Sequence, residues 1–278
     1  MAKGGYQKRR IAEKKQRERK ARKRQERNKK ILTGTIVVVL LAMIGAITFV
    51  ALTGDGDLAA TPTPSASVSP SEQPDTSAKF ATPCTKLSSV KKNQKMFTDP
   101  PCKIIKDNRS YSATFQTSMG KVEVELLAAD APVTVNNFVF LARAGFFDGS
   151  IFHRVIPDFG GKGSNMVQGG DAVNRDGTGD PGYSFGDENF LPFDKPGYLA
   201  MANSGPGSNG SQFFFLDGTV SHLNAPGACP GSGCHSVFGR VSGGLKVVGE
   251  IATVKRGEGD KPVKDVVLRK VTIEETRR

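Results

Sequence analysis

Residues 152–171 read FHRVIPDFGGKGSNMVQGGD, and this stretch sets the architecture that we expect for the chain. Apolar runs at 151–155 and 166–168 flank a glycine-rich turn. Short apolar runs bounded by Gly, Pro and Asn are typical of β-strands. Further runs of the same kind follow at 198–201, 212–216 and 237–241. The pattern therefore predicts a series of short strands joined by turns.

The residues before and after this series add two helices and two strands. Between residues 121 and 126, Val and Leu alternate with Lys and Glu, which is the period of two expected for a strand with one buried face. A helix follows, which Asp130 can cap, with Pro132 in its first turn and Gly145 after its end. A second helix is predicted at 245–251 and a last strand at 266–273. Many short strands and only two helices predict a mainly β fold, either a sandwich or a closed antiparallel barrel.

The positive charge of the chain is concentrated in its first 30 residues. The formal net charge is +12, and residues 1–30 account for all of it with fifteen Lys and Arg against three Glu. The remaining 248 residues carry equal numbers of basic and acidic side chains. A balanced domain has no field that would attract nucleic acid, so we expect no nucleic-acid partner. The basic tail is either a topology signal or a helix that lies against anionic headgroups.

Residues 31–53 are predicted to form a transmembrane helix. The stretch ILTGTIVVVLLAMIGAITFVAL, residues 31–52, has no charged residue and no proline, and as a helix it would cross a hydrocarbon core of about 30 Å. A cleaved signal peptide with a processing site near residues 59–60 is the alternative, but its apolar region is only about 7 to 15 residues long. Because Lys- and Arg-rich flanks stay in the cytoplasm, we predict a single-pass cell-membrane protein with a cytoplasmic N-terminus and an extracytoplasmic domain.

A linker and a cysteine-containing segment precede the packed domain. Residues 54–83 are rich in Pro, Ser and Thr and are predicted to be a tether, and a lead-in segment follows at 84–110. The four cysteines all lie beyond the predicted membrane helix, where disulfides persist. They are Cys84, Cys102, Cys229 and Cys234. Pairing Cys84 with Cys102 and Cys229 with Cys234 closes two short loops, but the sequence leaves all three possible pairings open.

Motifs for cofactors and metals are incomplete in this sequence. The G-x-G-x-x-G pattern at 177–182 has no strand before it and contains Pro181, and at 160–164 a glycine separates Lys162 from Ser164, where a phosphate loop needs them adjacent. The three histidines and four cysteines form neither a C-x-x-C pair nor an H-x(3–5)-H pair. We therefore expect no cofactor and no metal.

Three segments carry the function. They are FHRVIP at 152–157, QGGD at 168–171, and MAN at 201–203 together with NGSQFF at 209–214. Their order and content closely resemble the cyclophilin family of peptidyl-prolyl cis-trans isomerases, here in a membrane-anchored bacterial form. The resemblance covers about residues 111–276 and implies an isomerase domain at 111–278. The implied fold is a closed eight-stranded antiparallel β-barrel capped by two α-helices, with an active groove on its outer surface.

The resemblance also implies roles for individual residues, with proline-containing polypeptides as partners and a monomeric enzyme. Arg154 looks like the catalytic residue. The proline pocket is implied to consist of Phe159, Met166, Phe214 and Leu223. Gln168, Ala202, Asn203 and Gln212 look like the groove residues that hold the substrate backbone, and His235 looks like the histidine at the pocket edge.

The chain departs from the family pattern at three places. Residues 160–165 separate the pocket Phe and Met, which are usually adjacent in the family. His222 stands where the family often has the Trp that binds cyclosporin, so we expect weak inhibition by that drug. The insert at 225–233 either shapes access to the pocket or stiffens a long loop.

The implied chemistry fits these residue types. Rotation about an X-Pro bond faces a barrier of about 18–20 kcal/mol because the C–N bond has partial double-bond character. An enzyme must bind the twisted amide more tightly than either planar form. In the twisted amide the prolyl nitrogen regains its lone pair, and the guanidinium of Arg154 can donate to it. The alternatives are a module or chaperone that holds proline segments in the same groove without turnover, and a role centred on the basic tail.

Overall fold

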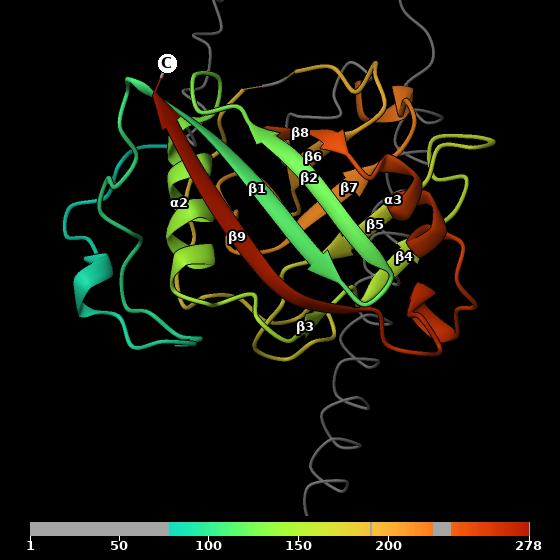
Figure 1. Ribbon diagram of the computed structural model, residues 1–278, viewed down its shortest axis with the longest axis horizontal. Coiled ribbons are helices and arrows are strands. Elements are labelled where there is room, and N and C mark those ends of the chain that lie inside the picture. Colours follow the sequence, from blue (N-terminus) through green and yellow to red (C-terminus); the bar gives the residue numbers. More distant parts are fainter. Residues whose placement is uncertain (1–77, 190, 225–234, 278) are drawn as a thin grey trace, which may run out of the picture. The chain divides into compact units, whose positions relative to one another are not determined.

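The computed structural model describes residues 78–189, 191–224 and 235–277 (Figure 1). The predicted basic tail, the membrane helix at 31–53, most of the linker, and Cys229 and Cys234 lie outside these residues. Within the described ranges, none of the helices has both the length and the apolar character needed to cross a membrane.

The described residues form nine strands, two α-helices and three short 3-10 helices. The strands are β1 (Arg109–Thr117), β2 (Gly120–Leu126), β3 (Ser150–Ile151), β4 (Arg154–Ile156), β5 (Met166–Gly169), β6 (Tyr198–Met201), β7 (Phe213–Leu216), β8 (Val237–Gly243) and β9 (Val267–Arg277). The helices are α2 (Pro132–Arg143) and α3 (Leu245–Ala252), and the 3-10 helices are η1 (Leu87–Ser89), η2 (Ser221–Asn224) and η3 (Glu258–Asp260).

All nine strands join one antiparallel sheet that curls back toward its own beginning. The strand order is β3-β9-β1-β2-β8-β6-β7-β5-β4, and only Phe152 and His153 separate the two end strands along the chain. Helix α2 contacts β9, and α3 contacts β2, β4 and β5 (Figure 1). A mainly β, curled antiparallel sheet with two helices is therefore confirmed.

Residue patterns predict seven strands and the structure has nine, because β1 was not predicted and one predicted strand is divided. The sequence predicts a single strand at 151–155, whereas Ser150 and Ile151 pair with β9 and residues 154–156 pair with β5. The chain bends between these two partners, so it forms two strands. No ladder joins β3 to β4 in the described part of the chain, and a closed eight-stranded barrel stays a prediction.

Period-two alternation sends aromatic side chains to the inside of the curled sheet. Alternate residues of β1 and β2 are buried, as predicted for a strand with one covered face. The ring of Phe115 lies 5.6 Å from Phe138 of α2 and 5.0 Å from Phe215 of β7. Phe213 belongs to the same cluster, with its ring 5.6 Å from that of Phe115. These contacts fix α2 against the sheet and form the inner core.

Helix α2 begins as predicted at Pro132, but the predicted cap is wrong. Its N-cap residue is Ala131, which makes no side-chain cap, and Asp130 does not fill this role. Instead, the carboxylate of Glu188 accepts hydrogen bonds from the backbone N–H groups of Val133 at 2.9 Å and Thr134 at 2.7 Å. A carboxylate at a helix N-terminus satisfies these donors and favours the helix dipole. The cap therefore comes from a residue far away in sequence.

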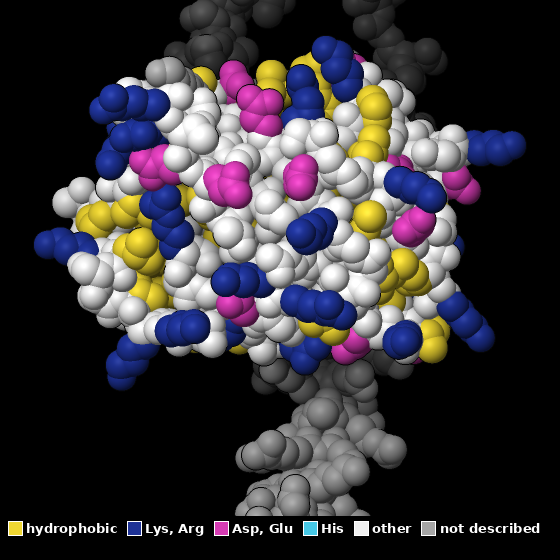
Figure 2. All heavy atoms as spheres, viewed as in Figure 1, with side chains coloured by type: hydrophobic (Ala, Val, Ile, Leu, Met, Phe, Trp, Pro, Cys, Tyr) yellow, Lys and Arg dark blue, Asp and Glu magenta, His cyan; other side chains and the backbone are white. Residues whose placement is uncertain are grey.

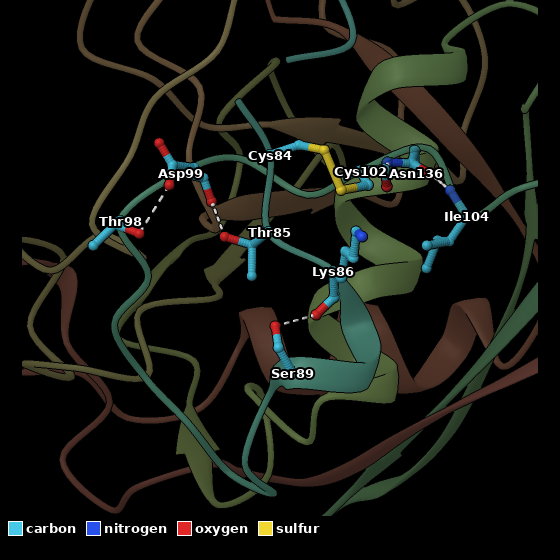
Figure 3. The surroundings of a disulfide bond; sticks show 9 residues. All are labelled: Cys84, Thr85, Lys86, Ser89, Thr98, Asp99, Cys102, Ile104 and Asn136. Atoms are coloured by element: carbon cyan, nitrogen blue, oxygen red, sulfur yellow. Dashed lines mark hydrogen bonds between the residues drawn. A yellow bond between two sulfur atoms is a disulfide. The ribbon is translucent and has the colours of Figure 1, made fainter. Parts of the chain in front are cut away.

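The lead-in segment packs against α2 and contains a disulfide between Cys84 and Cys102, which confirms one of the two favoured pairings (Figure 3). The side chain of Asn136 on α2 ties this segment to the helix (Figure 3). Its amide donates to the carbonyl of Cys102 at 3.0 Å, and its oxygen accepts from the N–H of Ile104 at 2.7 Å.

Basic and acidic side chains are interspersed over the face of the domain shown in Figure 2. This distribution agrees with the equal numbers of basic and acidic residues that follow the N-terminal tail.

Candidate active site

The four residues predicted to form a proline pocket lie together in a second apolar cluster. Met166 and Phe214 are buried in this outer cluster, and Phe159 and Leu223 pack against it with part of their surfaces exposed. The other buried members are Phe193, Tyr198, Ala200, Leu216, Val220 and Val237. The outer cluster is separate from the inner core, so it offers two buried and two partly exposed apolar side chains to a small ring.

Two histidines contact the outer cluster through their rings. The ring of His222 lies 4.9 Å from that of Phe159, and the ring of His235 lies 5.2 Å from that of Phe214. His235 Nδ1 is 2.9 Å from the carbonyl oxygen of Met201, which can only accept, so Nδ1 carries the proton. Burial lowers the pKa of His235, although this hydrogen bond opposes the shift. His235 is therefore a neutral ring at the edge of the outer cluster near pH 7.

The register of the sheet places Arg154 in one row with the outer cluster. Arg154 on β4 pairs with Gln168 on β5, and Gln168 pairs with Phe214 on β7. Phe214 in turn pairs with Ala200 on β6. Residues directly opposite each other in antiparallel strands share a face of the sheet. Arg154 and the ring of Phe214 therefore lie on the same outer face.

Arg154 reaches the surface and is restrained by an acidic neighbour. Its side chain is 46% exposed, and its Nε lies 3.8 Å from Oδ2 of Asp260 in η3. Oδ1 of Asp260 accepts a hydrogen bond from Nη1 of Arg256 at 3.2 Å. An exposed ion pair adds little to stability, so its effect is mainly on orientation. Contact through Nε restrains the stem of Arg154, while the two terminal amino groups carry its other donors.

A cavity of about 510 Å³ adjoins this row, and all four predicted groove residues line it. They are Gln168, Ala202, Asn203 and Gln212. The remaining lining residues are mostly small or polar and come from segments 177–184 and 204–211. The structure therefore brings the predicted backbone-holding residues together beside the predicted proline pocket.

Hydrogen bonds fix the two glutamines of the groove. Gln168 Nε2 donates to Gln212 Oε1 at 3.1 Å, and Gln212 Nε2 donates to the carbonyls of Gly177 and Gly179 at 2.9 Å each. The N–H of Ala202 donates to the carbonyl of Gln212 at 3.0 Å. The polar side of the groove is thus set before any ligand arrives, which reduces the ordering cost of binding.

The comparison with known families decides the assignment. The sequence profile described as "Cyclophilin type peptidyl-prolyl cis-trans isomerase/CLD" matches residues 112–273, which is more than half of the chain. The chain belongs to the cyclophilin family. This is an enzyme family, and its members include proteins named peptidyl-prolyl cis-trans isomerases.

Relatives of this cyclophilin come from bacteria and from eukaryotes. It is 43% identical to peptidyl-prolyl cis-trans isomerase B of Streptomyces anulatus, over 58% of this chain and 95% of that protein. It is 41% identical to the probable peptidyl-prolyl cis-trans isomerase A of Mycobacterium leprae, over 58% of this chain and 91% of that protein. It is also 43% identical to peptidyl-prolyl cis-trans isomerase-like 2 of Cryptococcus neoformans, but there the match spans only 27% of the relative.

A solved structure supports the fold. The crystal structure of a Cryptosporidium parvum cyclophilin type peptidyl-prolyl cis-trans isomerase aligns with a TM-score of 0.52 and 26% identity. The alignment covers 59% of this chain and 98% of that chain. The family match begins at residue 112, so the disulfide-containing lead-in segment of this cyclophilin precedes it.

Sequence reasoning assigned no role to the buried acid Asp171, although it ends the QGGD segment. Its carboxylate accepts backbone hydrogen bonds from Asn174 at 2.8 Å, Gly177 at 2.9 Å and Gly179 at 3.0 Å. Burial alone would raise the pKa of Asp171, but the backbone donors outweigh it and lower the pKa to about 2. Asp171 therefore stays ionised and shapes the loop whose carbonyls hold Gln212.

A second buried acid, Asp187, supports the other side of the cavity. Its Oδ1 accepts from Nδ2 of Asn209 at 2.7 Å, and its Oδ2 accepts from the N–H of Gly207 at 2.9 Å. Asn209 Oδ1 in turn accepts from Nδ2 of Asn203 at 3.1 Å. Asp187 lies in a stretch without apolar periodicity, so the sequence carried no signal for it.

Across residues 78–189, 191–224 and 235–277, no group of three or more His, Cys, Asp or Glu side chains is placed to hold a metal ion.

His153, beside Arg154, is a buried histidine whose role the sequence did not reveal. It is 5% exposed, and neither ring nitrogen has a hydrogen-bond partner in the described structure. A Cβ added at Gly177 would lie 3.0 Å from His153 Nε2, so the ring packs directly under the loop at Asp171. Burial lowers the pKa of His153; the charges of Asp171 and Asp176 oppose this shift, and those of Arg154 and Lys261 add to it.

This burial predicts a pH-dependent stability. The folded protein favours the neutral ring, so its contribution is complete above the unfolded pKa of about 6.5 and declines as the pH falls toward the lower folded value. We expect His153→Gln to reduce the loss of unfolding free energy between about pH 7.5 and about pH 5, measured by urea denaturation. His222→Gln, at an exposed ring, is the control. An unchanged pH dependence in the His153 variant would contradict the assignment.

Proposed function

We propose that this chain is a peptidyl-prolyl cis-trans isomerase that accelerates rotation of X-Pro bonds in polypeptides, with Arg154 stabilising the twisted amide. The observation that carries the proposal is the shared row of Arg154, Gln168 and Phe214 across three adjacent strands. This row puts a permanent cation beside an apolar cluster that can take a five-membered ring. The family assignment supports the same reaction.

The proposed mechanism depends on the difference between the planar and twisted amides. Conjugation in the planar amide occupies the lone pair of the prolyl nitrogen, so it accepts no hydrogen bond. Rotation releases that lone pair, and a terminal N–H of Arg154 donates to it. The interaction exists only near the transition state, so it lowers the barrier without trapping either isomer.

The outer cluster binds the proline ring of the substrate, and the cavity binds its flanking backbone. Met166, Phe214 and Phe159 hold the pyrrolidine ring, because burying an apolar ring there removes it from water. Gln168, Asn203 and Gln212 hold the flanking backbone in the cavity. With the pyrrolidine ring and the flanking backbone both held, rotation occurs about the C–N bond that joins proline to the preceding residue. No proton is transferred, so His235 serves as part of the pocket edge.

Replacing Arg154 with Ala tests the mechanism directly. We expect kcat/KM in a protease-coupled prolyl-peptide assay to fall by an amount equivalent to about 3–4 kcal/mol, by analogy with the removal of one oxyanion-hole donor. Arg175→Ala is a matched control, because Arg175 is also 46% exposed and also pairs with an acid, Asp265, at 3.4 Å. Undiminished turnover in the Arg154 variant would overturn the role given to Arg154. An unmodified chain that binds the peptide without turnover would instead favour a proline-binding module.

His222 predicts weak inhibition by cyclosporin. The exposed imidazole against Phe159 offers less apolar surface than the indole that the family often has at this position. We expect His222→Trp to lower the inhibition constant for cyclosporin while changing peptide turnover little, as measured in the same coupled assay. A low-nanomolar inhibition constant for the unmodified protein would show that His222 is no obstacle.

We further propose that the isomerase is anchored in the cell membrane, as a monomer with its catalytic domain outside the cytoplasm, and that it assists the folding of secreted proteins. The apolar, uncharged stretch at 31–53 and the basic residues before it support this topology. The disulfide between Cys84 and Cys102 fits an oxidising compartment.

Deleting residues 31–53 tests the anchor. We expect the full chain to sediment with membranes and to be degraded by protease added outside intact cells, and the deletion variant to lose membrane association. Recovery of the full chain in the soluble fraction, shortened at about residue 60, would favour a cleaved signal peptide.

A further inference from the structure

One wall of the 510 Å³ cavity rests on residues that precede the family match. Gly182 and Tyr183 line this cavity, and the segment 84–102 lies behind them. The N–H of Phe97 donates to the carbonyl of Pro181 at 2.8 Å. A Cβ at Gly182 would lie 2.3 Å from the carbonyl oxygen of Phe97, so the two backbones are in close contact at this point.

The side chain of Phe97 fixes this contact from the other side. Phe97 is 6% exposed, and its ring lies 5.4 Å from that of Phe140 on α2 in an edge-to-face arrangement. It also lies 6.3 Å from the rings of Phe146 and Tyr183. A single aromatic side chain therefore joins α2 to the cavity wall.

The wall continues through hydrogen bonds to a second part of the cavity lining. The hydroxyl of Tyr183 donates to Oδ1 of Asn137 at 2.7 Å, and Nδ2 of Asn137 donates to the carbonyl of Gly210 at 2.9 Å. Tyr183 and Gly210 both line the cavity. A shift of Phe97 would therefore move two sides of the cavity, at Tyr183 and at Gly210.

The conformation of segment 84–102 depends on the links between its two ends, because the segment has almost no apolar core of its own. Only Phe97 and Pro101 are buried within it. Its ends are joined by the disulfide between Cys84 and Cys102 (Figure 3). Backbone hydrogen bonds from Thr85 to Pro100 at 2.8 Å and from Cys102 to Thr85 at 2.9 Å join them as well. These links hold the segment in the form that presents Phe97 to the wall.

We propose that the disulfide-closed segment 84–102 is a positioning element of the groove, and that Phe97 is the positioning residue that sets the Pro181–Tyr183 wall. The proposal rests on the proposed isomerase function and deepens it. Phe97 touches the cavity wall and not the row that contains Arg154. Substrate residues that reach into the cavity therefore bind with an affinity that depends on this segment, while rotation at the X-Pro bond does not.

The test compares peptides of increasing length on the full chain in detergent. Each peptide carries one central Ala-Pro, flanked by one to four residues on each side. For Phe97→Ala we expect KM and the calorimetric Kd to rise by about fivefold for the long peptides, with kcat within about twofold and with the shortest peptide unaffected. Hydrogen exchange of a fragment spanning residues 180–186 should become faster.

Matched variants separate positioning from general damage to the fold. Met96→Ala removes the adjacent side chain, which is 54% exposed, and should leave every value unchanged. Phe97→Leu keeps an apolar side chain and should restore most of the affinity for long peptides. Cys84→Ser with Cys102→Ser should shift KM in the same direction as Phe97→Ala.

The outcomes distinguish the two proposals. A folded Phe97→Ala variant with unchanged affinities for all peptides would overturn the positioning role, and so would a uniform loss of kcat at every length. An unmodified chain without turnover, indistinguishable from Arg154→Ala, would overturn the isomerase function instead. In that case the length-dependent Kd still decides whether Phe97 positions the cavity wall.

Discussion

The alternation of side chains along β7 is the constraint on which both halves of the domain depend. Phe213 and Phe215 enter the inner core, and Phe214, between them, enters the outer cluster. A shift of pairing by one residue would exchange these faces, removing two rings from the core and one from the groove. A one-residue shift of FFFL at residues 213–216 therefore satisfies neither cluster, and the observed register also aligns Gln168 and Arg154 with Phe214.

The polar side of the groove is built on a different principle from the apolar side. Asp171 and Asp187 are buried and accept hydrogen bonds mainly from backbone N–H groups and a buried amide. Their carboxylates therefore stabilise loop conformations and do not face a ligand. The loop shaped by Asp171 then presents the carbonyls of Gly177 and Gly179 to Gln212. A groove that is ordered in advance loses less conformational entropy on binding than one that must close around its substrate.

Local pattern was sufficient for most of the fold. The helices at 132–143 and 245–252 and the strand around residue 122 follow from local pattern along one buried face. The strands around residues 167, 199 and 239 follow from short apolar runs bounded by Gly, Pro and Asn. The period of two along a strand also accounts for the separation of Phe213 and Phe215 in the inner core from Phe214 in the outer cluster. The motif residues were found because the family resemblance supplied their spatial relation.

What the sequence could not supply were contacts between distant segments. Local sequence predicted Asp130 as the cap of α2, but Glu188, from a distant loop, accepts the hydrogen bonds of the first-turn backbone N–H groups. Asp260 beside Arg154 and Phe97 behind Gly182 likewise depend on loops whose paths no periodicity describes. The bend that divides residues 150–156 into two strands arises because the chain changes partners, which is a property of the whole sheet.

The choice of arginine for the row beside Phe214 has a consequence for acid tolerance. In the mechanism proposed above, Arg154 assists rotation by donating a hydrogen bond, and it neither gains nor loses a proton. Under that proposal, acid affects turnover only through the structure that holds Arg154. The buried ring of His153, the preceding residue, is one place where protonation would disturb that structure. For an isomerase that works as we propose, the acid limit of catalysis and the acid limit of the native state coincide.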